Sequence, residues 1–326
     1  MTLRTALKLS MLLALCLTTA LAAAAGGSGK VARIVILFGS PPGPVVNDLR
    51  QRLQMLRSAN GQSPIVEIWS AQGRTELLPG MAAELVRSKV DVIVAITNLS
   101  AFAAKNATHR IPIVAVSAHD AVGTGLARSL ARPGGNITGT ESLAPELDAK
   151  RTQLITQMVP GLKHLAVLYN PDDQGSPIHL KWAQSAGQTL GFWISRLEVR
   201  RAADFEAVLR DAAGKRPDGL LILGDPVTFQ NWKYVNEFAQ EHRVPTVCEF
   251  GPLVEAGCLV SYGPTFDEPF ERAVQQVDRI LKGAKPADIP FEQPTRFELV
   301  VNRRTAAAIG ITIPQAILLQ ATRVVD

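Results

Sequence analysis

The sequence has few cysteines, few aromatic residues and no run of like charges. Three cysteines in 326 residues cannot build the dense disulfide framework of a small secreted domain. The formal net charge is +5, without a lysine and arginine run that could follow a phosphate backbone, so nucleic acid is not an expected partner. A hydrophobic content of 47% excludes intrinsic disorder, and the length suffices for two domains that share a cleft.

Sequence motifs of common enzyme classes are also missing. No G-x-G-x-x-G follows the first predicted strand, and the chain has no G-x-x-x-x-G-K-[ST], G-x-S-x-G or H-E-x-x-H. We therefore expect no cofactor. The histidines lack metal-ligand spacing, so no metal is expected either; they are His109, His119, His164, His179 and His242. His119 and Asp120 could form an acid-base pair, but a loop cap or a pocket contact is the favoured interpretation.

The first 25 residues differ from the rest of the chain. Arg4 and Lys8 precede an apolar run over 9–25 that ends in alanines. This pattern predicts a cleaved signal peptide over 1–25 and a periplasmic protein, because the run is marginal for a membrane span of about 20 residues. Cys16 lies inside the run and follows Leu15, which does not fit a lipid attachment site. Removal of the two cations would leave a charge of about +3 (5 minus 2).

Cys248 and Cys258 would remain after cleavage, in a compartment where disulfides persist. Each lies at the end of an apolar run, VPTVC and CLVSY, so the two could bridge adjacent strands. They could equally be two buried thiols that pack as small hydrophobic groups. The sequence leaves both possibilities open.

Short apolar runs alternate with longer amphipathic runs over 32–118, and the same alternation returns over 164–250. Strands that are apolar on both faces and separated by helices indicate a parallel sheet covered on both sides. The predicted fold class is therefore α/β, with two doubly wound parallel-sheet lobes. A helix over 145–158 would lead from the first series into the second.

The stretch LARPGGNITGTES, residues 130–142, separates the two series. Pro133, Gly134 and Gly135 exclude a regular element and allow backbone angles that other residues reach only with strain. Asn136 would then start the strand that leaves the first lobe. We interpret the stretch as the path into a hinge.

The C-terminal part contains one helix over 267–284 and one strand over 297–302, too few elements for a third domain. It must return to both lobes, which requires three crossings between them, near 139–144, 261–265 and 293–297. The predicted division is 31–142 with 263–294 for lobe 1, and 143–262 with 295–326 for lobe 2.

Candidate ligand-binding residues follow the predicted strands, because open parallel sheets bind ligands beyond the carboxyl ends of their strands. They are Gly39, Ser40, Trp69, Thr97, Asn98, Ser117, His119 and Asp120 in lobe 1, and Asn170, Asp225, Glu249, Phe250 and Tyr262 in lobe 2. Asn, Asp, Ser and Thr before a helix are also common helix caps, which is the alternative interpretation of each one alone.

The candidates differ in chemistry between the lobes. Lobe 1 offers hydroxyls and amides before helices, whose free N–H groups suit a carboxylate. Lobe 2 offers Asp225 and Glu249, which suit a cation. Aromatic side chains would enclose the apolar middle of the ligand. They are Trp69, Tyr169, Phe250 and Tyr262. The set predicts a small zwitterion such as an amino acid.

Separate blocks of the sequence also match a known family. They include IPIVAVSAHDAVGTGLARSLARPGGNITG, LAPELDAKR, HLAVLYNP, LVSYGP, ILKGAKPADIPFEQPTRFELVVN and AAAIGITIP, in order from about residue 31 to the C-terminus. In these blocks the chain resembles the substrate-binding proteins of bacterial ABC transporters, specifically the tryptophan/tyrosine transport family. The resemblance implies a type I periplasmic binding protein, two α/β lobes with a three-crossing hinge.

The resemblance further implies a monomer that closes on a small ligand, an amino acid or related zwitterion, and delivers it to an ABC permease in the inner membrane. The family's pocket positions fall here on Gly39 and Ser40, on Thr97 and Asn98, on residues 117–120, on Asn170 and on Asp225. The chain departs from the family after the third strand, where Thr97-Asn98-Leu99 replaces a glycine-threonine-proline-like turn.

Two other function classes remain at this point. A sensory receptor could present the same closed form to a membrane kinase or chemoreceptor, and the sequence does not separate sensing from transport. A secreted α/β enzyme could use His119, Asp120 and Asp225 in the cleft, but it would have to show turnover.

Overall fold

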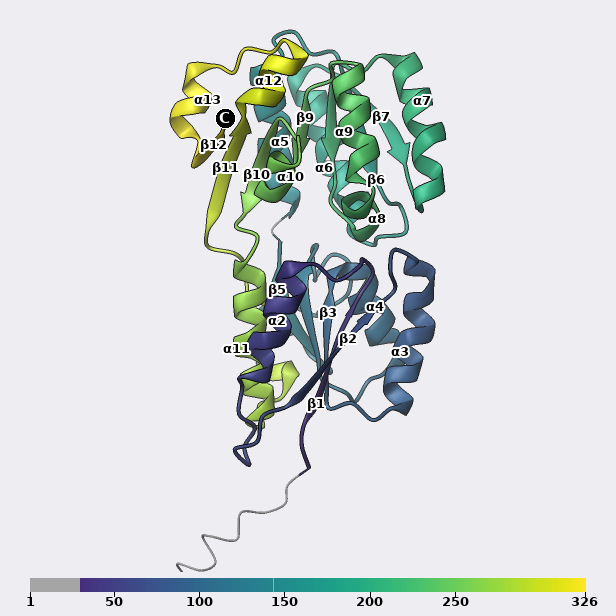
Figure 1. Cartoon of the computed structure of the whole chain (residues 1–326), viewed down its shortest axis with the longest axis vertical. Helices are drawn as coiled ribbons and strands as arrows, with labels where there is room; N and C mark the ends of the chain where they lie inside the picture. The colour runs from purple at the N-terminus through teal and green to yellow at the C-terminus, as the bar shows by residue number, and fades with distance from the viewer. Residues whose placement is uncertain (1–29, 143) are drawn as a thin grey trace, which may run out of the picture.

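The computed structural model describes residues 30–142 and 144–326, which form two stacked α/β lobes (Figure 1). The predicted signal peptide lies outside the described residues. Among those residues, no helix combines the length and the apolar character that crossing a membrane requires.

Lobe 1 is built on a five-stranded parallel sheet of order β2-β1-β3-β4-β5. Its elements are β1 (Arg33–Phe38), α2 (Pro44–Gln54), β2 (Ile65–Ser70), η1 (Thr75–Leu77), α3 (Leu78–Arg87), β3 (Val92–Ile96), α4 (Thr97–Ala107), β4 (Ile113–Ala118) and β5 (Ile137–Glu141). Two elements from the C-terminal part join it, α11 (Glu268–Leu281) and η3 (Pro286–Asp288).

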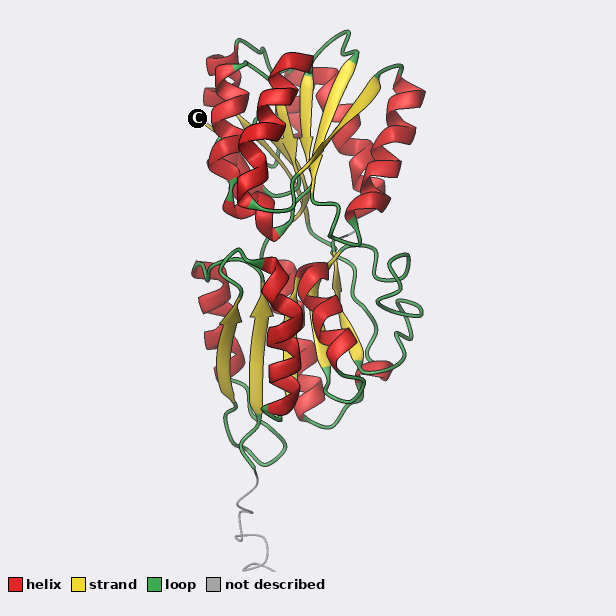
Figure 2. Ribbon diagram, turned by 90° about the vertical axis from the view of Figure 1, so that its right-hand side faces the viewer, coloured by secondary structure: helices red, strands yellow, loops and turns green. Residues whose placement is uncertain are grey.

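Helices cover both faces of this sheet, as Figure 2 shows. On one face α2 and α11 pack side by side, where Leu49 and Leu53 share a cluster with Ala273 and Val277. On the other face α3 and α4 pack against β1, β3 and β4. The inner strands are buried on both sides, which explains their unbroken runs of Val and Ile.

Lobe 2 is built on a seven-stranded sheet of order β12-β11-β10-β9-β8-β6-β7. Its elements are α5 (Ala144–Met158), β6 (His164–Tyr169), α6 (Ser176–Leu190), β7 (Trp193–Glu198), η2 (Ala202–Asp204), α7 (Phe205–Lys215), β8 (Gly219–Ile222), α8 (Pro226–Gln230), α9 (Trp232–Glu241), β9 (Thr246–Cys248), α10 (Gly251–Glu255), β10 (Val260–Pro264), β11 (Phe297–Asn302), α12 (Arg303–Ile309), α13 (Gln315–Gln320) and β12 (Arg323–Val325). Helices α5, α6, α12 and α13 cover one face, and α7, α9 and α10 the other.

The predicted fold class of two doubly wound lobes is confirmed, with one difference in lobe 2. Strand β11 runs antiparallel to β10, while its neighbour β12 runs parallel to β11. The chain enters β11 from the cleft side, after its return from lobe 1, so β11 must run against β10, which leaves toward the cleft. Local sequence pattern carries no information about this direction.

Three connections join the lobes, between β5 and α5, between β10 and α11, and between η3 and β11. The first and third are paired, because Glu292 N donates to Gly139 O and Glu141 N donates to Glu292 O, both at 2.9 Å. The second and third are joined through Glu268 at the start of α11. Its carboxylate accepts hydrogen bonds from the backbone N–H groups of Thr295 and Arg296.

The junction at 130–142 has the predicted backbone geometry. Gly134 and Gly135 both have φ of +71°, in the left-handed region that favours glycine, which confirms their expected role. Asn136 precedes β5, and its amide donates to the carbonyls of Thr108 and Ile111. Gly139 in β5 lies so close to β4 that an added Cβ would be 2.1 Å from Ala115 O.

Cys248 and Cys258 are free buried thiols, which corrects the possibility of a disulfide. Each Sγ lies against backbone carbonyls of the core, with Val260 O at 3.6 Å from Cys248 and 3.3 Å from Cys258. Burial raises the pKa of the Cys248 thiol well above its usual value. The pair packs as small hydrophobic groups.

Candidate functional site

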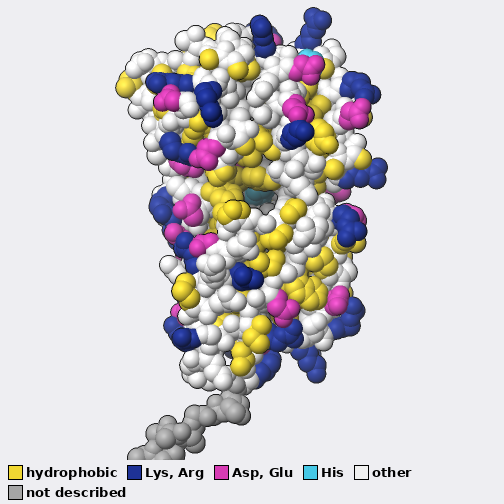
Figure 3. All heavy atoms as spheres, in the orientation of Figure 1, with side chains coloured by type: hydrophobic (Ala, Val, Ile, Leu, Met, Phe, Trp, Pro, Cys, Tyr) yellow, Lys and Arg dark blue, Asp and Glu magenta, His cyan; other side chains and the backbone are white. Residues whose placement is uncertain are grey.

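A cavity of about 340 Å³ lies between the lobes, at the carboxyl ends of the strands in both sheets. Figure 3 shows the hollow at mid-height, bordered by hydrophobic side chains. Lobe 1 contributes Phe38, Gly39, Ser40, Pro41, Gly43, Pro44, Val45, Val46, Ile96, Thr97, Ser117 and His119. Lobe 2 contributes Gly224, Pro226, Phe229 and Phe250, and Phe266 and Phe270 come from the second connection and α11. The volume falls in the range of small-molecule sites.

One wall of the cavity is a continuous row of phenylalanines. Ring centroids are 5.9 Å apart for Phe229 and Phe250, 5.5 Å for Phe250 and Phe266, and 5.8 Å for Phe266 and Phe270. Such rings attract a planar or large apolar group by stacking and by burial. The row crosses from lobe 2 to lobe 1, so a ligand against it contacts both.

The lobes are in contact across the cleft. Ser40 Oγ donates to Pro226 O at 3.3 Å, and a Cβ added at Gly39 would lie 3.0 Å from Pro226 Cβ. A Cβ added at Gly175 would lie 2.5 Å from His119 Cβ. The structure is therefore the closed arrangement of the two lobes.

Two helices of lobe 1 begin at the cavity without a side-chain cap. Helix α2 follows Gly43 and α4 follows Ile96, and neither preceding residue has a side chain that caps the first turn. The first turns therefore present unsatisfied N–H groups and the positive end of the helix dipole. The cavity is lined by Gly43 just before α2, by Val45 and Val46 in its first turn, and by Thr97 at the start of α4. The lobe 1 end of the cavity therefore suits a carboxylate.

Strained backbone is concentrated at the same end. Thr97 has φ of +69°, Ser117 of +54° and Asp120 of +46°. Left-handed angles are costly for a β-branched residue such as Thr97, and residues held this way gather at ligand sites. Asn98 holds the strained loop after β4, because its side-chain amide both donates to His119 O at 3.0 Å and accepts from His119 N at 2.9 Å.

The structure brings about half of the predicted residues together in the cavity. Those in the lining are Gly39, Ser40, Thr97, Ser117, His119 and Phe250. Those outside the lining are Trp69, Asn98, Asp120, Asn170, Asp225, Glu249 and Tyr262. The lining contains no acidic side chain, which differs from the acidic lobe 2 end that the sequence suggested.

Asp225 acts within lobe 2 as the cap of α8. Its carboxylate accepts from Thr228 N at 2.7 Å and from the Asn170 amide at 2.6 Å. Burial raises the pKa of Asp225 to about 6, although the hydrogen bonds from Thr228 and Asn170 act in the opposite direction.

The other residues outside the lining make local contacts. Trp69 Nε1 donates to Glu67, and Asp120 accepts from Gly123 N. Tyr262 O accepts from Arg151 Nε. Glu249 is buried beside Arg151, with Oε1 at 3.6 Å from its guanidinium.

Sequence reasoning missed most of the phenylalanine wall. Phe229 lies in the short helix α8, and Phe266 and Phe270 flank the start of α11. Phe38, which ends a predicted strand and lines the cavity apart from the wall, was missed as well. The available signal was their position directly beside a strand end or a crossing, although each also fits an ordinary core residue.

The chain is similar to known proteins in both sequence and structure. The family model described as ABC transporter substrate binding protein matches residues 31–325. A tyrosine-binding protein of Clostridioides difficile is 26% identical over 252 residues, 77% of this chain and 72% of the relative. A conserved domain protein of Vibrio cholerae has a crystal structure with a TM-score of 0.82 at 26% identity, covering 90% of this chain and 100% of that one.

A further solved structure, an ABC domain from Streptococcus pneumonia in complex with L-Trp, has a TM-score of 0.79 at 22% identity and covers 91% of this chain and all of that chain. The leucine-binding protein LivK of Thermotoga maritima has the same general fold, at a TM-score of 0.53, 14% identity, 79% of this chain and 78% of that one. These likenesses concern the fold, which is that of type I periplasmic binding proteins.

Proposed function

Because the chain belongs to the family of ABC transporter substrate-binding proteins, we propose that it is the receptor of an importer and captures an amino acid or related zwitterion with an aromatic or large apolar side chain. The proposal rests on a cavity between two closed lobes, with a phenylalanine wall and two helix N-termini that lack a side-chain cap. We expect the protein to bind this ligand without converting it.

The cavity suggests one orientation of the ligand. The carboxylate would lie at the first turns of α2 and α4, where free N–H groups and the helix dipoles favour an anion. The apolar side chain would lie against Phe229, Phe250 and Phe266. Since the lining has no carboxylate side chain, we expect the ammonium group to contribute less than the carboxylate. The tyrosine-binding relative and the tryptophan complex agree with this ligand class.

Binding would work through closure of the lobes. A ligand that contacts both lobes only in the closed form shifts the population toward that form, and a permease would recognise it. We place the protein in the periplasm as a monomer, with the predicted signal peptide at 1–25 as its export signal. A small ligand and the permease are its partners, and nucleic acid is not.

Isothermal titration calorimetry with ligand analogues tests the proposal. L-Tyrosine, L-tryptophan, L-phenylalanine and L-leucine form the first series. Tyramine, which lacks the carboxylate, and 3-(4-hydroxyphenyl)propionate, which lacks the ammonium, form the second. We expect at least one aromatic amino acid to bind 1:1, and loss of the carboxylate to cost about 1.5 to 3 kcal/mol, the range for hydrogen bonds to a charged group. Failure of every compound in the first series would overturn the proposed ligand class.

A further inference from the structure

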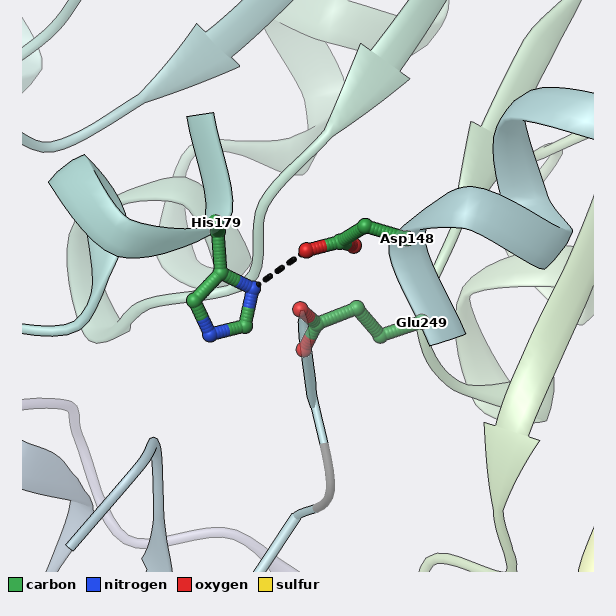
Figure 4. A group of neighbouring side chains, drawn as sticks. All are labelled: Asp148, His179 and Glu249. Atoms are coloured by element: carbon green, nitrogen blue, oxygen red, sulfur yellow. Dashed lines mark ion pairs between the residues drawn. The ribbon is translucent and has the colours of Figure 1, made fainter. Parts of the chain in front are cut away.

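A second group of polar side chains lies inside lobe 2, behind the ligand cavity. Asp148 on α5, His179 on α6 and Glu249 after β9 converge on one point, as Figure 4 shows. The first two side chains are fully buried and Glu249 is 1% exposed. One oxygen or nitrogen from each residue lies within 4.8 Å of those of the other two.

Several nitrogen and oxygen atoms of these side chains have no hydrogen-bond partner. His179 Nε2 and both carboxylate oxygens of Glu249 are buried without a hydrogen-bond partner. His179 Nδ1 forms an ion pair with Asp148 Oδ2 at 2.8 Å, drawn as a dashed line in Figure 4, so Nε2 is the ring nitrogen of His179 that remains without a partner. Buried polar atoms are normally satisfied, because leaving one unpaired is costly. Atoms left in this way around one point indicate a missing partner.

The charges point to a cation as that partner. Asp148 and Glu249, together with Asp173 next to His119, supply three buried carboxylates. Arg151 is the buried guanidinium beside them, at 2.7 Å from Asp148 and 3.6 Å from Glu249. Histidines that bind a metal are neutral, and in that state three carboxylates and one guanidinium give −2 (1 minus 3), which one divalent cation balances in place of a proton on His179.

A fourth donor comes from the other lobe. His119 of lobe 1 has Nε2 at 3.9 Å from Glu249 Oε2, and its ring centroid is 4.8 Å from that of His179. Asn98 fixes the backbone of His119 at this position. The imidazole therefore reaches from lobe 1 to the edge of the group in lobe 2.

We propose that Asp148, His179 and Glu249 bind a divalent transition-metal ion, with His119 as a fourth ligand that joins the lobes. Imidazole nitrogens with carboxylate oxygens are the ligand set of Zn²⁺ and related ions, whereas Mg²⁺ and Ca²⁺ prefer six or more oxygens. Tetrahedral zinc ligands lie about 3.4 Å from one another. The atoms that are up to 4.8 Å apart here must draw together by up to about 1.4 Å, while Asp148 and His179, at 2.8 Å, must move slightly apart.

Arg151 does not compete for the same oxygen of Asp148. Its guanidinium bonds Oδ1, while Oδ2 faces His179. The arginine therefore orients the carboxylate from outside the site, as second-layer groups commonly do for metal ligands. Because His119 comes from lobe 1, the ion stabilises the closed arrangement even without the ligand of the cavity.

Metal titration of the untagged protein, first treated with EDTA and then freed of it, tests the proposal. We expect Zn²⁺ to bind 1:1 by calorimetry, with Mg²⁺ and Ca²⁺ as controls that do not bind at the same concentration. His179→Gln and Glu249→Gln should each weaken Zn²⁺ binding by at least about 10- to 100-fold. His164→Gln is the matched control, since His164 is also buried but stacks on Trp193 outside the group.

Cobalt substitution keeps the test decisive if a variant fails to fold. Co²⁺ in the wild type should give the visible bands of a tetrahedral site without thiolate charge transfer. A thiolate band would assign the ion to Cys248 and Cys258 and overturn the proposal, as would the absence of 1:1 Zn²⁺ binding. X-ray scattering supplies the second readout. Zn²⁺ should reduce the radius of gyration of the wild type but not that of His119→Gln. An equal reduction in both would show that His119 is not a ligand. Amino-acid binding measured in EDTA tests the proposed function separately.

Discussion

At the scale of single residues, burial decides which polar groups are free to bind and which are committed to the fold. Asp225 follows a strand and looks like a ligand residue in sequence, yet both of its oxygens are engaged within lobe 2. Its pKa of about 6 is the sign of that burial. The carboxyl is stable as a neutral group and costly as an anion.

Replacement of Asp225 by asparagine should therefore change how stability depends on pH. The folded pKa of about 6 exceeds the ordinary value of 3.8, so the contribution of Asp225 is fully present below pH 3.8 and lost as the pH rises through 6. Asn is an equally good helix cap and stays neutral. We expect the unfolding free energy of Asp225→Asn, relative to that of the wild type, to rise by up to about 3 kcal/mol between pH 4 and 7. Urea unfolding at a series of pH values measures this, and a constant difference would contradict it.

At the scale of elements, hydrogen bonds join the three connections to one another. Glu268 at the start of α11 accepts from Thr295 and Arg296 of the third connection and pairs with Arg272. Burial acts to raise the pKa of Glu268, but the Thr295, Arg296 and Arg272 bonds outweigh it and lower the pKa to about 2. The hinge therefore depends on an ionised carboxylate.

Glu268→Gln should loosen this hinge. The folded pKa lies below the ordinary value of 4.5, so the contribution of Glu268 is present above pH 4.5 and lost as the pH falls toward 2. We expect the variant to lose about 1 to 3 kcal/mol of unfolding free energy at pH 7 and to approach the wild type only as the pH falls to about 2. Glu271→Gln on the same helix is the control, because Glu271 pairs with Arg296 at an exposed site. Equal losses in the two variants would contradict a special role of Glu268.

The glycines of the junction at 130–142 are a second feature at the scale of elements. Gly135 has φ of +71° and nothing within 4 Å of an added Cβ, so Gly135→Ala changes backbone strain alone. We expect a loss of about 1 to 2 kcal/mol in thermal or urea unfolding. Gly80→Ala in α3 also meets open space, without a left-handed angle, and should be neutral or slightly stabilising. A neutral Gly135→Ala would show that the junction tolerates other backbone angles.

How far the sequence predicts these elements depends on whether the signal is local. The alternation of apolar and amphipathic runs predicted both lobes, and Pro133, Gly134 and Gly135 marked their junction. The antiparallel direction of β11 and the packing of α11 on lobe 1 depend on contacts distant in sequence. In the same way, Asp148 and His179 come together only through the pairing of α5 with α6, so histidine spacing gave no indication of their group.

At the scale of the whole molecule, closure brings glycine backbone of lobe 1 against lobe 2. A Cβ at Gly39 would lie 3.0 Å from Pro226 Cβ of lobe 2 and 3.0 Å from Thr75 Cγ2 of lobe 1. A larger residue there opposes closure through Pro226, and it also presses on Thr75 within its own lobe. Measuring both unfolding and ligand binding of one variant at Gly39 therefore separates folding of the lobes from their closure.

Gly39→Val should close poorly, and urea unfolding without ligand measures separately what the contact with Thr75 costs lobe 1. Overpacking of this kind costs about 1 to 3 kcal/mol, so the affinity for the amino-acid ligand should fall roughly 5- to 150-fold through the smaller closed fraction. Small-angle scattering should show the wild type become more compact on binding, by about 1 Å in radius of gyration, and the variant do so only at higher ligand concentration. Gly214→Ala, on α7 with open space around it, is the control and should behave as the wild type. If the wild type binds tightly without compaction, the closure mechanism is wrong; if Gly39→Val binds and compacts as the wild type does, the contact between Gly39 and Pro226 does not limit closure.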